Sequence, residues 1–138
     1  MELGIIGAGN MGSSILKGVI TSNFLVSEDI TVFDLNQEKV ENLVKKYGIK
    51  ASESENELVE KSNILILSVK PNIVPIVLKK IKDKLDKNTI ILSIAAGVSI
   101  DFIEKNIGSD KKVVRTMPNT PAQVMQGMTA VSFNSNIE

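Results

Sequence analysis

The first sixteen residues constrain the fold more than any other part of the chain. An apolar run over residues 3–6 leads directly into the spacing G-x-G-x-x-G, with glycines at positions 7, 9 and 12. Behind the glycines, apolar residues recur with the spacing of one helix face, at Met11, Ile15, Leu16, Val19 and Ile20. The pattern predicts a strand, a tight turn and a helix, which is the context that makes this glycine spacing specific.

Each glycine of this loop meets a different physical demand. Gly7 permits the sharp turn after the strand, Gly9 lets a phosphate approach the backbone, and Gly12 lets the helix pack closely on the strand. The helix start at residues 10–13 would direct unpaired N–H groups and the positive end of the helix dipole at a pyrophosphate. The loop therefore predicts dinucleotide binding; the alternative is that its glycines only make a turn.

Strand and helix patterns alternate through the rest of the chain. Further strands are expected at 30–34, 49–51, 63–69, 89–94, 112–117 and 127–133, the last with an antiparallel orientation as one option. Further helices are expected at 40–47, 53–61 and 72–85, and after Ser99, where Phe102 and Ile103 would be buried. This alternation predicts an α/β fold: a Rossmann-type, doubly wound, mainly parallel sheet with helices on both faces.

The composition excludes several function classes. The 138 residues, 43% of them hydrophobic, fit one globular domain, and sixteen basic against sixteen acidic residues favour neither nucleic acid nor an anionic membrane. Without cysteine or histidine there is no disulfide, no Ser-His-Asp triad and no usual zinc ligand, so no metal site is expected. No apolar run approaches a membrane span of ~20 residues and no signal segment opens the chain, so a cytoplasmic location is expected.

Asp34 bears on the choice of dinucleotide. It ends the second expected strand, 22 residues after Gly12. A carboxylate at this position can accept hydrogen bonds from the adenosine ribose, and its charge disfavours a 2′-phosphate, which favours NADH over NADPH. The alternative is that Asp34 simply caps the next helix.

Two later loops follow buried parallel strands, and such loops face the ligand crevice. They are Lys70-Pro71 and the small residues 95–97. Lys70 is the nearest candidate for a general acid or base, although a cation beside phosphate or solvent is the interpretation we favour. No catalytic residue is assigned.

With these loops in view, the sequence resembles the N-terminal part of pyrroline-5-carboxylate reductase over essentially the whole chain. The glycine loop alone would fit many dehydrogenases, and the motif at 115–121 is what indicates this family. The motifs that carry the resemblance are IIGAGNMG at 5–12, VKP at 69–71, SIAAGV at 93–98, RTMPNTP at 115–121 and GMT at 127–129.

The resemblance implies NAD(P)H-dependent reduction of 1-pyrroline-5-carboxylate to L-proline, the last step of proline biosynthesis. It also implies cofactor contacts: the pyrophosphate at residues 6–11, the ribose at Asp34, the cofactor's path along 68–71 and its nicotinamide end at 95–97. The residues expected to bind the cofactor are Ile6, Gly7, Ala8, Gly9, Asn10, Met11, Gly12, Asp34, Ser68, Val69, Lys70, Pro71, Ala95, Ala96 and Gly97.

The chain departs from the family pattern in two respects. Members commonly use NADPH and carry neutral or basic residues after the second strand, whereas Asp34-Leu35-Asn36 favours NADH here. Members also continue into a C-terminal helical domain that forms the dimer and supplies the substrate-carboxylate site. Residues 1–138 are therefore expected to be the cofactor-binding domain of a longer homodimer or larger homo-oligomer, and to be inactive alone.

Two alternatives stay open at this point. One is the first domain of a β-hydroxyacid-dehydrogenase-like oxidoreductase, from which only the motif at 115–121 separates this chain. The other is a non-catalytic module that senses a dinucleotide.

Overall fold

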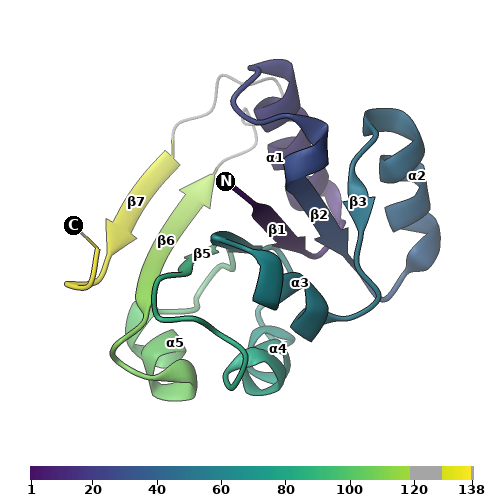
Figure 1. Ribbon diagram of the computed structural model, residues 1–138. Coiled ribbons are helices and arrows are strands. Elements are labelled where there is room, and N and C mark those ends of the chain that lie inside the picture. The colour runs from purple at the N-terminus through teal and green to yellow at the C-terminus, as the bar shows by residue number, and fades with distance from the viewer. Residues whose placement is uncertain (119–128, 138) are drawn as a thin grey trace.

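A seven-stranded sheet runs through the part of the chain that the computed structural model describes, residues 1–118 and 129–137 (Figure 1). The strands are β1 (Leu3–Ile6), β2 (Ile30–Phe33), β3 (Lys50–Ala51), β4 (Ile64–Leu67), β5 (Ile90–Ser93), β6 (Lys112–Pro118) and β7 (Thr129–Phe133). Their order in space is β3-β2-β1-β4-β5-β6-β7, with the first six parallel and β7 antiparallel to β6. This is the strand order of a dinucleotide-binding fold, and the expected mainly parallel sheet is confirmed.

Helices cover both faces of the sheet. They are α1 (Asn10–Thr21), α2 (Gln37–Tyr47), α3 (Glu55–Lys61), α4 (Val74–Ile81) and α5 (Ile100–Ile107), with a short 3₁₀ turn η1 (Ser27–Asp29) before β2. Buried residues of α1 and α2 join one hydrophobic cluster, and those of α3, α4 and α5 join a second cluster on the opposite face. The doubly wound arrangement is therefore confirmed.

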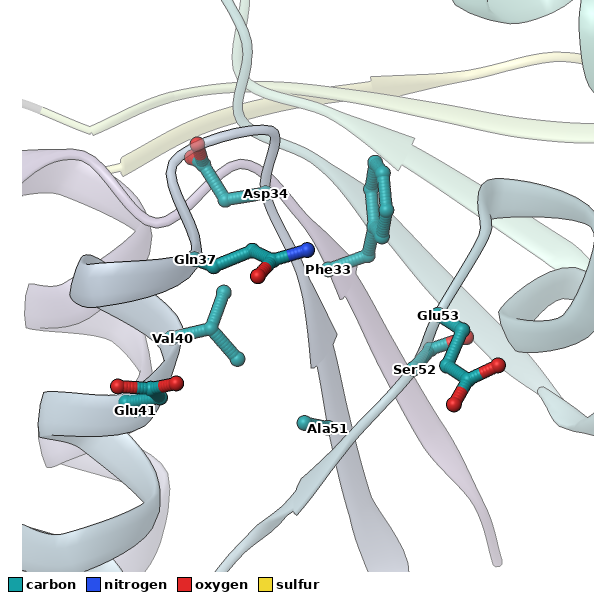
Figure 2. Close-up of a pocket in the computed structure, with 8 residues that line it drawn as sticks. All are labelled: Phe33, Asp34, Gln37, Val40, Glu41, Ala51, Ser52 and Glu53. Carbon is teal, nitrogen blue, oxygen red and sulfur yellow. The ribbon is translucent and has the colours of Figure 1, made fainter.

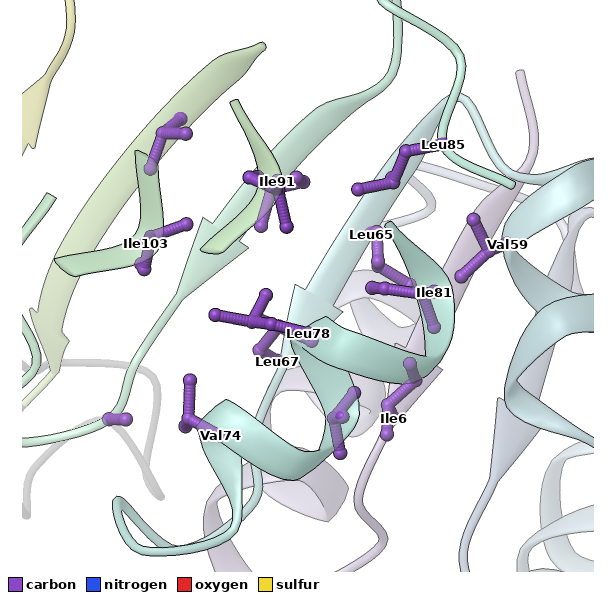
Figure 3. Close-up of a cluster of buried hydrophobic side chains, with 14 of the residues drawn as sticks. Ile6, Val59, Leu65, Leu67, Val74, Leu78, Ile81, Leu85, Ile91 and Ile103 are labelled. Atoms are coloured by element: carbon purple, nitrogen blue, oxygen red, sulfur yellow. The ribbon is translucent and has the colours of Figure 1, made fainter. Parts of the chain in front are cut away.

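The second cluster is built around α4 (Figure 3). The buried side chains of α4 stand at positions i, i+3, i+4 and i+7, which places them on one helix face above β4 and β5. They are Val74, Val77, Leu78 and Ile81. Leu78 and Ile81 are 0% exposed, as are Leu65 and Ile91 of the strands beneath. Because burying one such side chain contributes about 1.5–3 kcal/mol, this face holds the carboxyl end of β4 firmly in place.

Some elements differ from the expected ones at their ends: α4 ends at Ile81 before the expected residue 85, whereas α2 begins at Gln37 before the expected residue 40. One expected core residue also lies outside the core. Ser99 caps α5 as expected, accepting a hydrogen bond from the backbone N–H of Phe102. Ile103 and Ile107 are buried, but the side chain of Phe102 is 39% exposed, so its predicted burial is wrong. The two isoleucines are four residues apart on one face, and Phe102 is turned about 100° away from that face.

No helix among the described residues is long and apolar enough to cross a membrane. The cytoplasmic location stays a prediction.

Candidate functional site

The register of the central strands brings the predicted site residues to one edge of the sheet. Ile6 at the end of β1 pairs with Phe33 of β2 on one side and with Leu67 of β4 on the other. Gly7, Asp34 and Ser68 follow these three residues directly, so the three loops start at the same level. The strand order reverses between β1 and β4, and in such sheets the ligand crevice opens at this reversal.

The glycine loop makes the tight turn that its spacing predicts. Gly7 has a φ of 109°, which non-glycine residues rarely adopt, and its N–H donates to the carbonyl of Phe33 at 2.8 Å. A Cβ on Gly12 would collide with the carbonyl oxygen of Gly7 and lie 2.6 Å from Oγ of Ser68. A Cβ on Gly9, in contrast, would have no atom within 4 Å. The first and third glycines are thus required by the fold, and the second faces open space.

Ser68 fastens the glycine loop to β4. Its Oγ lies 2.6 Å from the carbonyl oxygen of Gly7 and 3.1 Å from that of Ile6, and its N–H donates to the carbonyl of Ile6 at 2.9 Å. The Ser68 hydroxyl therefore donates its proton to backbone carbonyl oxygen at the loop. In this structure Ser68 supports the loop, and its direct contact with a cofactor stays a prediction.

Asp34 fastens the same loop to β2. Its Oδ2 accepts a hydrogen bond from the N–H of Ala8 at 2.6 Å, and its Oδ1 accepts one from the N–H of Asn36 at 2.8 Å. The N-cap of α2 is Asn36, whose side chain accepts from the N–H of Lys39. The interpretation of Asp34 as a helix cap is therefore wrong. Because a carboxylate offers about four acceptor positions, both oxygens can still accept a further hydrogen bond.

The start of α1 is open to an anion. Its N-cap is Gly9, which has no side chain to accept from the first-turn N–H groups, and the first turn contains no acidic residue. The N–H groups of a first helical turn have no acceptor within their own helix, and the helix dipole is positive there. The residues present therefore fit the pyrophosphate of a dinucleotide.

Two cavities flank Asp34, and both are lined by Phe33 and Asp34. The cavity on the β3 side has a volume of about 530 Å³ (Figure 2). Its lining residues are Phe33, Asp34, Gln37, Val40, Glu41, Ala51, Ser52 and Glu53. The cavity on the β4 side has a volume of about 170 Å³ and a mainly aliphatic lining, with an ion pair of 3.4 Å between Lys80 and Glu55 among its residues. Its lining residues are Ile6, Gly7, Phe33, Asp34, Leu35, Glu55, Val69, Ile73, Ile76, Val77 and Lys80.

The remaining predicted residues follow β4 and β5, whose carboxyl ends lie at the same edge of the sheet. Val69 is half-buried in the β4-side cavity, whereas Lys70 and Pro71 are exposed. After β5, Ala95 is buried, and Ala96 and Gly97 are exposed. The motif at 115–121 begins on β6, and its residues 119–121, like 127 and 128 of the following motif, lie outside the described residues.

Asn56, in the first turn of α3, lines neither cavity. Its side-chain Oδ1 is buried and has no hydrogen-bond partner in the described part of the chain. No sequence signal marks this asparagine, because it stands within a run of glutamates.

Among the described residues no group of three or more His, Cys, Asp or Glu side chains is arranged to hold a metal ion.

Comparison with known proteins gives consistent matches. The family model described as NADP oxidoreductase coenzyme F420-dependent matches residues 2–97. A pyrroline-5-carboxylate reductase of Escherichia coli is 42% identical over 134 residues, which are 97% of this chain and 50% of that protein. The solved pyrroline-5-carboxylate reductase of Coxiella burnetii superposes with a TM-score of 0.94 at 29% identity, over 99% of this chain and 51% of the other.

A second solved structure is the Plasmodium falciparum pyrroline carboxylate reductase with NADP bound. It superposes with a TM-score of 0.89 at 30% identity, over 100% of this chain and 50% of that one. The chain thus spans about half the length of the relatives that it matches.

Proposed function

The chain belongs to the family described as NADP oxidoreductase coenzyme F420-dependent, and from that premise we propose that residues 1–138 are the dinucleotide-binding domain of a pyrroline-5-carboxylate reductase. The observation that carries the proposal is the glycine loop, held between Asp34 and Ser68 with an uncapped helix start behind it. The similarity to reductases over 97–100% of the chain supports the choice of this reaction among those of dinucleotide enzymes.

Each part of the dinucleotide has a matching surface at the sheet edge. The pyrophosphate would lie on residues 6–12 at the start of α1, where the helix dipole favours an anion. The adenine would pack in the aliphatic β4-side cavity, against Val69 and Ile73. The nicotinamide would extend over Ser68–Pro71 towards Ala95, Ala96 and Gly97, the small residues after β5.

The chemistry itself would be that of the bound cofactor, whose reduced nicotinamide would supply a hydride to the C=N carbon of 1-pyrroline-5-carboxylate while the ring nitrogen takes up a proton, giving L-proline. The residues of this chain hold and orient the dinucleotide. The groups that bind the substrate carboxylate belong, in this proposal, to a further helical domain that also forms a homodimer or larger homo-oligomer.

NADH is the proposed preferred cofactor. The two Asp34 oxygens keep acceptor positions for ribose hydroxyls beside their bonds to Ala8 and Asn36. A 2′-phosphate at the same place would instead meet a negative charge. The Plasmodium falciparum relative was solved with NADP, so the preference of this chain is a proposal separate from dinucleotide binding itself.

Two measurements test the function. Calorimetric titration of the 138-residue chain with NADH and NADPH is expected to give binding of both, with NADH tighter. The complete reading frame that contains this chain is then assayed for proline formation from 1-pyrroline-5-carboxylate and NADH. Failure of the chain to bind either nucleotide would refute the cofactor site, and binding without any turnover by the complete protein would favour a dinucleotide-sensing module.

A further inference from the structure

Three carboxylates surround the larger cavity, on the β3 side of Asp34. Asp34 stands at the end of β2, Glu41 on α2, and Glu53 on the segment after β3 (Figure 2). None of the described residues that line this cavity is a lysine or an arginine. The neutral polar residues of the lining are Ser52 and Gln37, whose amide extends from α2 towards Phe33. Glu41 and Glu53 lie at opposite margins of the cavity and Asp34 lies at the end of β2, so a substituent that enters this space lies between negatively charged side chains.

The position of Asp34 connects this cavity to the adenosine half of a dinucleotide. Asp34 lines both cavities, and its Oδ2 is already bound to Ala8 of the glycine loop. A ribose whose hydroxyls donate to Asp34 therefore lies at the boundary between the cavities. With the adenine in the aliphatic β4-side cavity and the pyrophosphate at α1, the space left for a group on the 2′-oxygen is the β3-side cavity.

We propose that Glu41 and Glu53 are specificity-determining residues, which act together with Asp34 to exclude the 2′-phosphate of NADPH. The inference rests on the proposed function, because it concerns which dinucleotide the same site accepts. Neither glutamate belongs to a motif that marks cofactor choice in the sequence. They line one cavity because α2 packs on the sheet beside β2 and the pairing of β3 with β2 places the segment after β3 across the cavity from α2.

We therefore expect that neutralising Asp34 alone does not change the cofactor preference of the site from NADH to NADPH. Two further charges remain around the cavity, and the substitution also removes the acceptor of the Ala8 N–H. Both glutamates are exposed, so water and salt screen them and each contributes modestly. We expect about a threefold gain in NADPH affinity for each glutamate neutralised and about tenfold for both. Raising the salt from 0.1 M to 1 M shortens the screening length from about 10 Å to about 3 Å and is expected to shrink this gain.

The test compares two double variants with the same net charge. Glu41→Gln with Glu53→Gln removes both cavity charges. Glu38→Gln with Glu60→Gln removes two exposed charges that do not line the cavity, one of them on the same helix as Glu41. Dissociation constants for NADH and NADPH are measured by calorimetry for both variants and for the unaltered chain, at low and high salt.

The expected result is a roughly tenfold gain in NADPH affinity for the cavity variant only, with NADH affinity changed by less than about twofold. An unchanged NADPH affinity, or an equal gain in the control variant, would overturn the inference while leaving NADH binding intact. Absence of NADH binding to the unaltered chain would instead refute the proposed function, and the inference with it. Thermal unfolding of each variant checks that the fold is kept, which is expected because all four side chains are exposed or at the surface.

Discussion

Replacing Asp34 by alanine tests the link between the glycine loop and β2. The substitution removes the acceptor of the 2.6 Å hydrogen bond from the Ala8 N–H and that of the Asn36 N–H. Hydrogen bonds to a charged group contribute about 1.5–3 kcal/mol when buried, and Asp34 is only partly buried. We therefore expect a loss of about 1–2 kcal/mol in the free energy of unfolding, which lowers Tm by roughly 3–8 °C for a domain of this size.

The same variant is expected to lose affinity for NADH by about tenfold or more, because the ribose hydroxyls lose their acceptor. Two assays on one preparation separate the effects: urea unfolding gives the stability, and calorimetry gives the dissociation constant. Asp34→Asn keeps an acceptor oxygen for Ala8 without the charge, so it is expected to recover much of the stability and to narrow the gap between NADH and NADPH. Asp83→Ala is the matched control, since Asp83 is exposed after α4 and far in sequence from the loop.

The refuting result is specific. If Asp34 contacted only the ribose, Asp34→Ala would weaken NADH binding and leave the unfolding curve unchanged. A stability within about 0.3 kcal/mol of the unaltered chain would therefore show that the bond to Ala8 contributes nothing to the fold.

Three further outcomes are expected. Gly12→Ala should strongly lower the free energy of unfolding in a urea titration, because its Cβ would meet the Gly7 carbonyl oxygen. Gly9→Ala should keep that stability, since no atom lies within 4 Å of its Cβ, and should weaken NADH binding in calorimetry. Equal stability of the two variants would contradict these different roles of the two glycines. Ser68→Ala should lower the free energy of unfolding by about 1 kcal/mol and raise the NADH dissociation constant a few-fold, because the loop loses the hydroxyl that lies against the carbonyl oxygens of Ile6 and Gly7. A loss of NADH binding with no change in stability would instead indicate a direct contact between Ser68 and the cofactor. The 138-residue chain alone should form no proline from 1-pyrroline-5-carboxylate and NADH in a spectrophotometric assay, and measurable turnover would show that the substrate site lies within these residues.

Local patterns in the chain were sufficient to predict the elements of the fold. The spacing of apolar residues indicated each helix and strand, and the glycine loop marked the turn between β1 and α1. Chain order then implied a parallel sheet, because strands alternate with helices. The ends of the elements and the exposure of Phe102 were not predictable in the same way, since they depend on how a helix turns when it packs against the sheet.

What the sequence by itself determined is therefore the glycine loop after the first strand and Asp34 at the end of the second. Ser68 was expected inside a strand over 63–69, and the structure ends β4 one residue before it. Only the tertiary structure decided what those residues do. Asp34 accepts a hydrogen bond from Ala8, 26 residues earlier, and Ser68 donates to the carbonyl of Gly7, 61 residues earlier. Glu41 and Glu53 likewise line one cavity only because the fold places α2 opposite the segment after β3. Periodicity reports which side of its own element a residue occupies, whereas these contacts depend on the register between strands, which forms only when the whole sheet assembles.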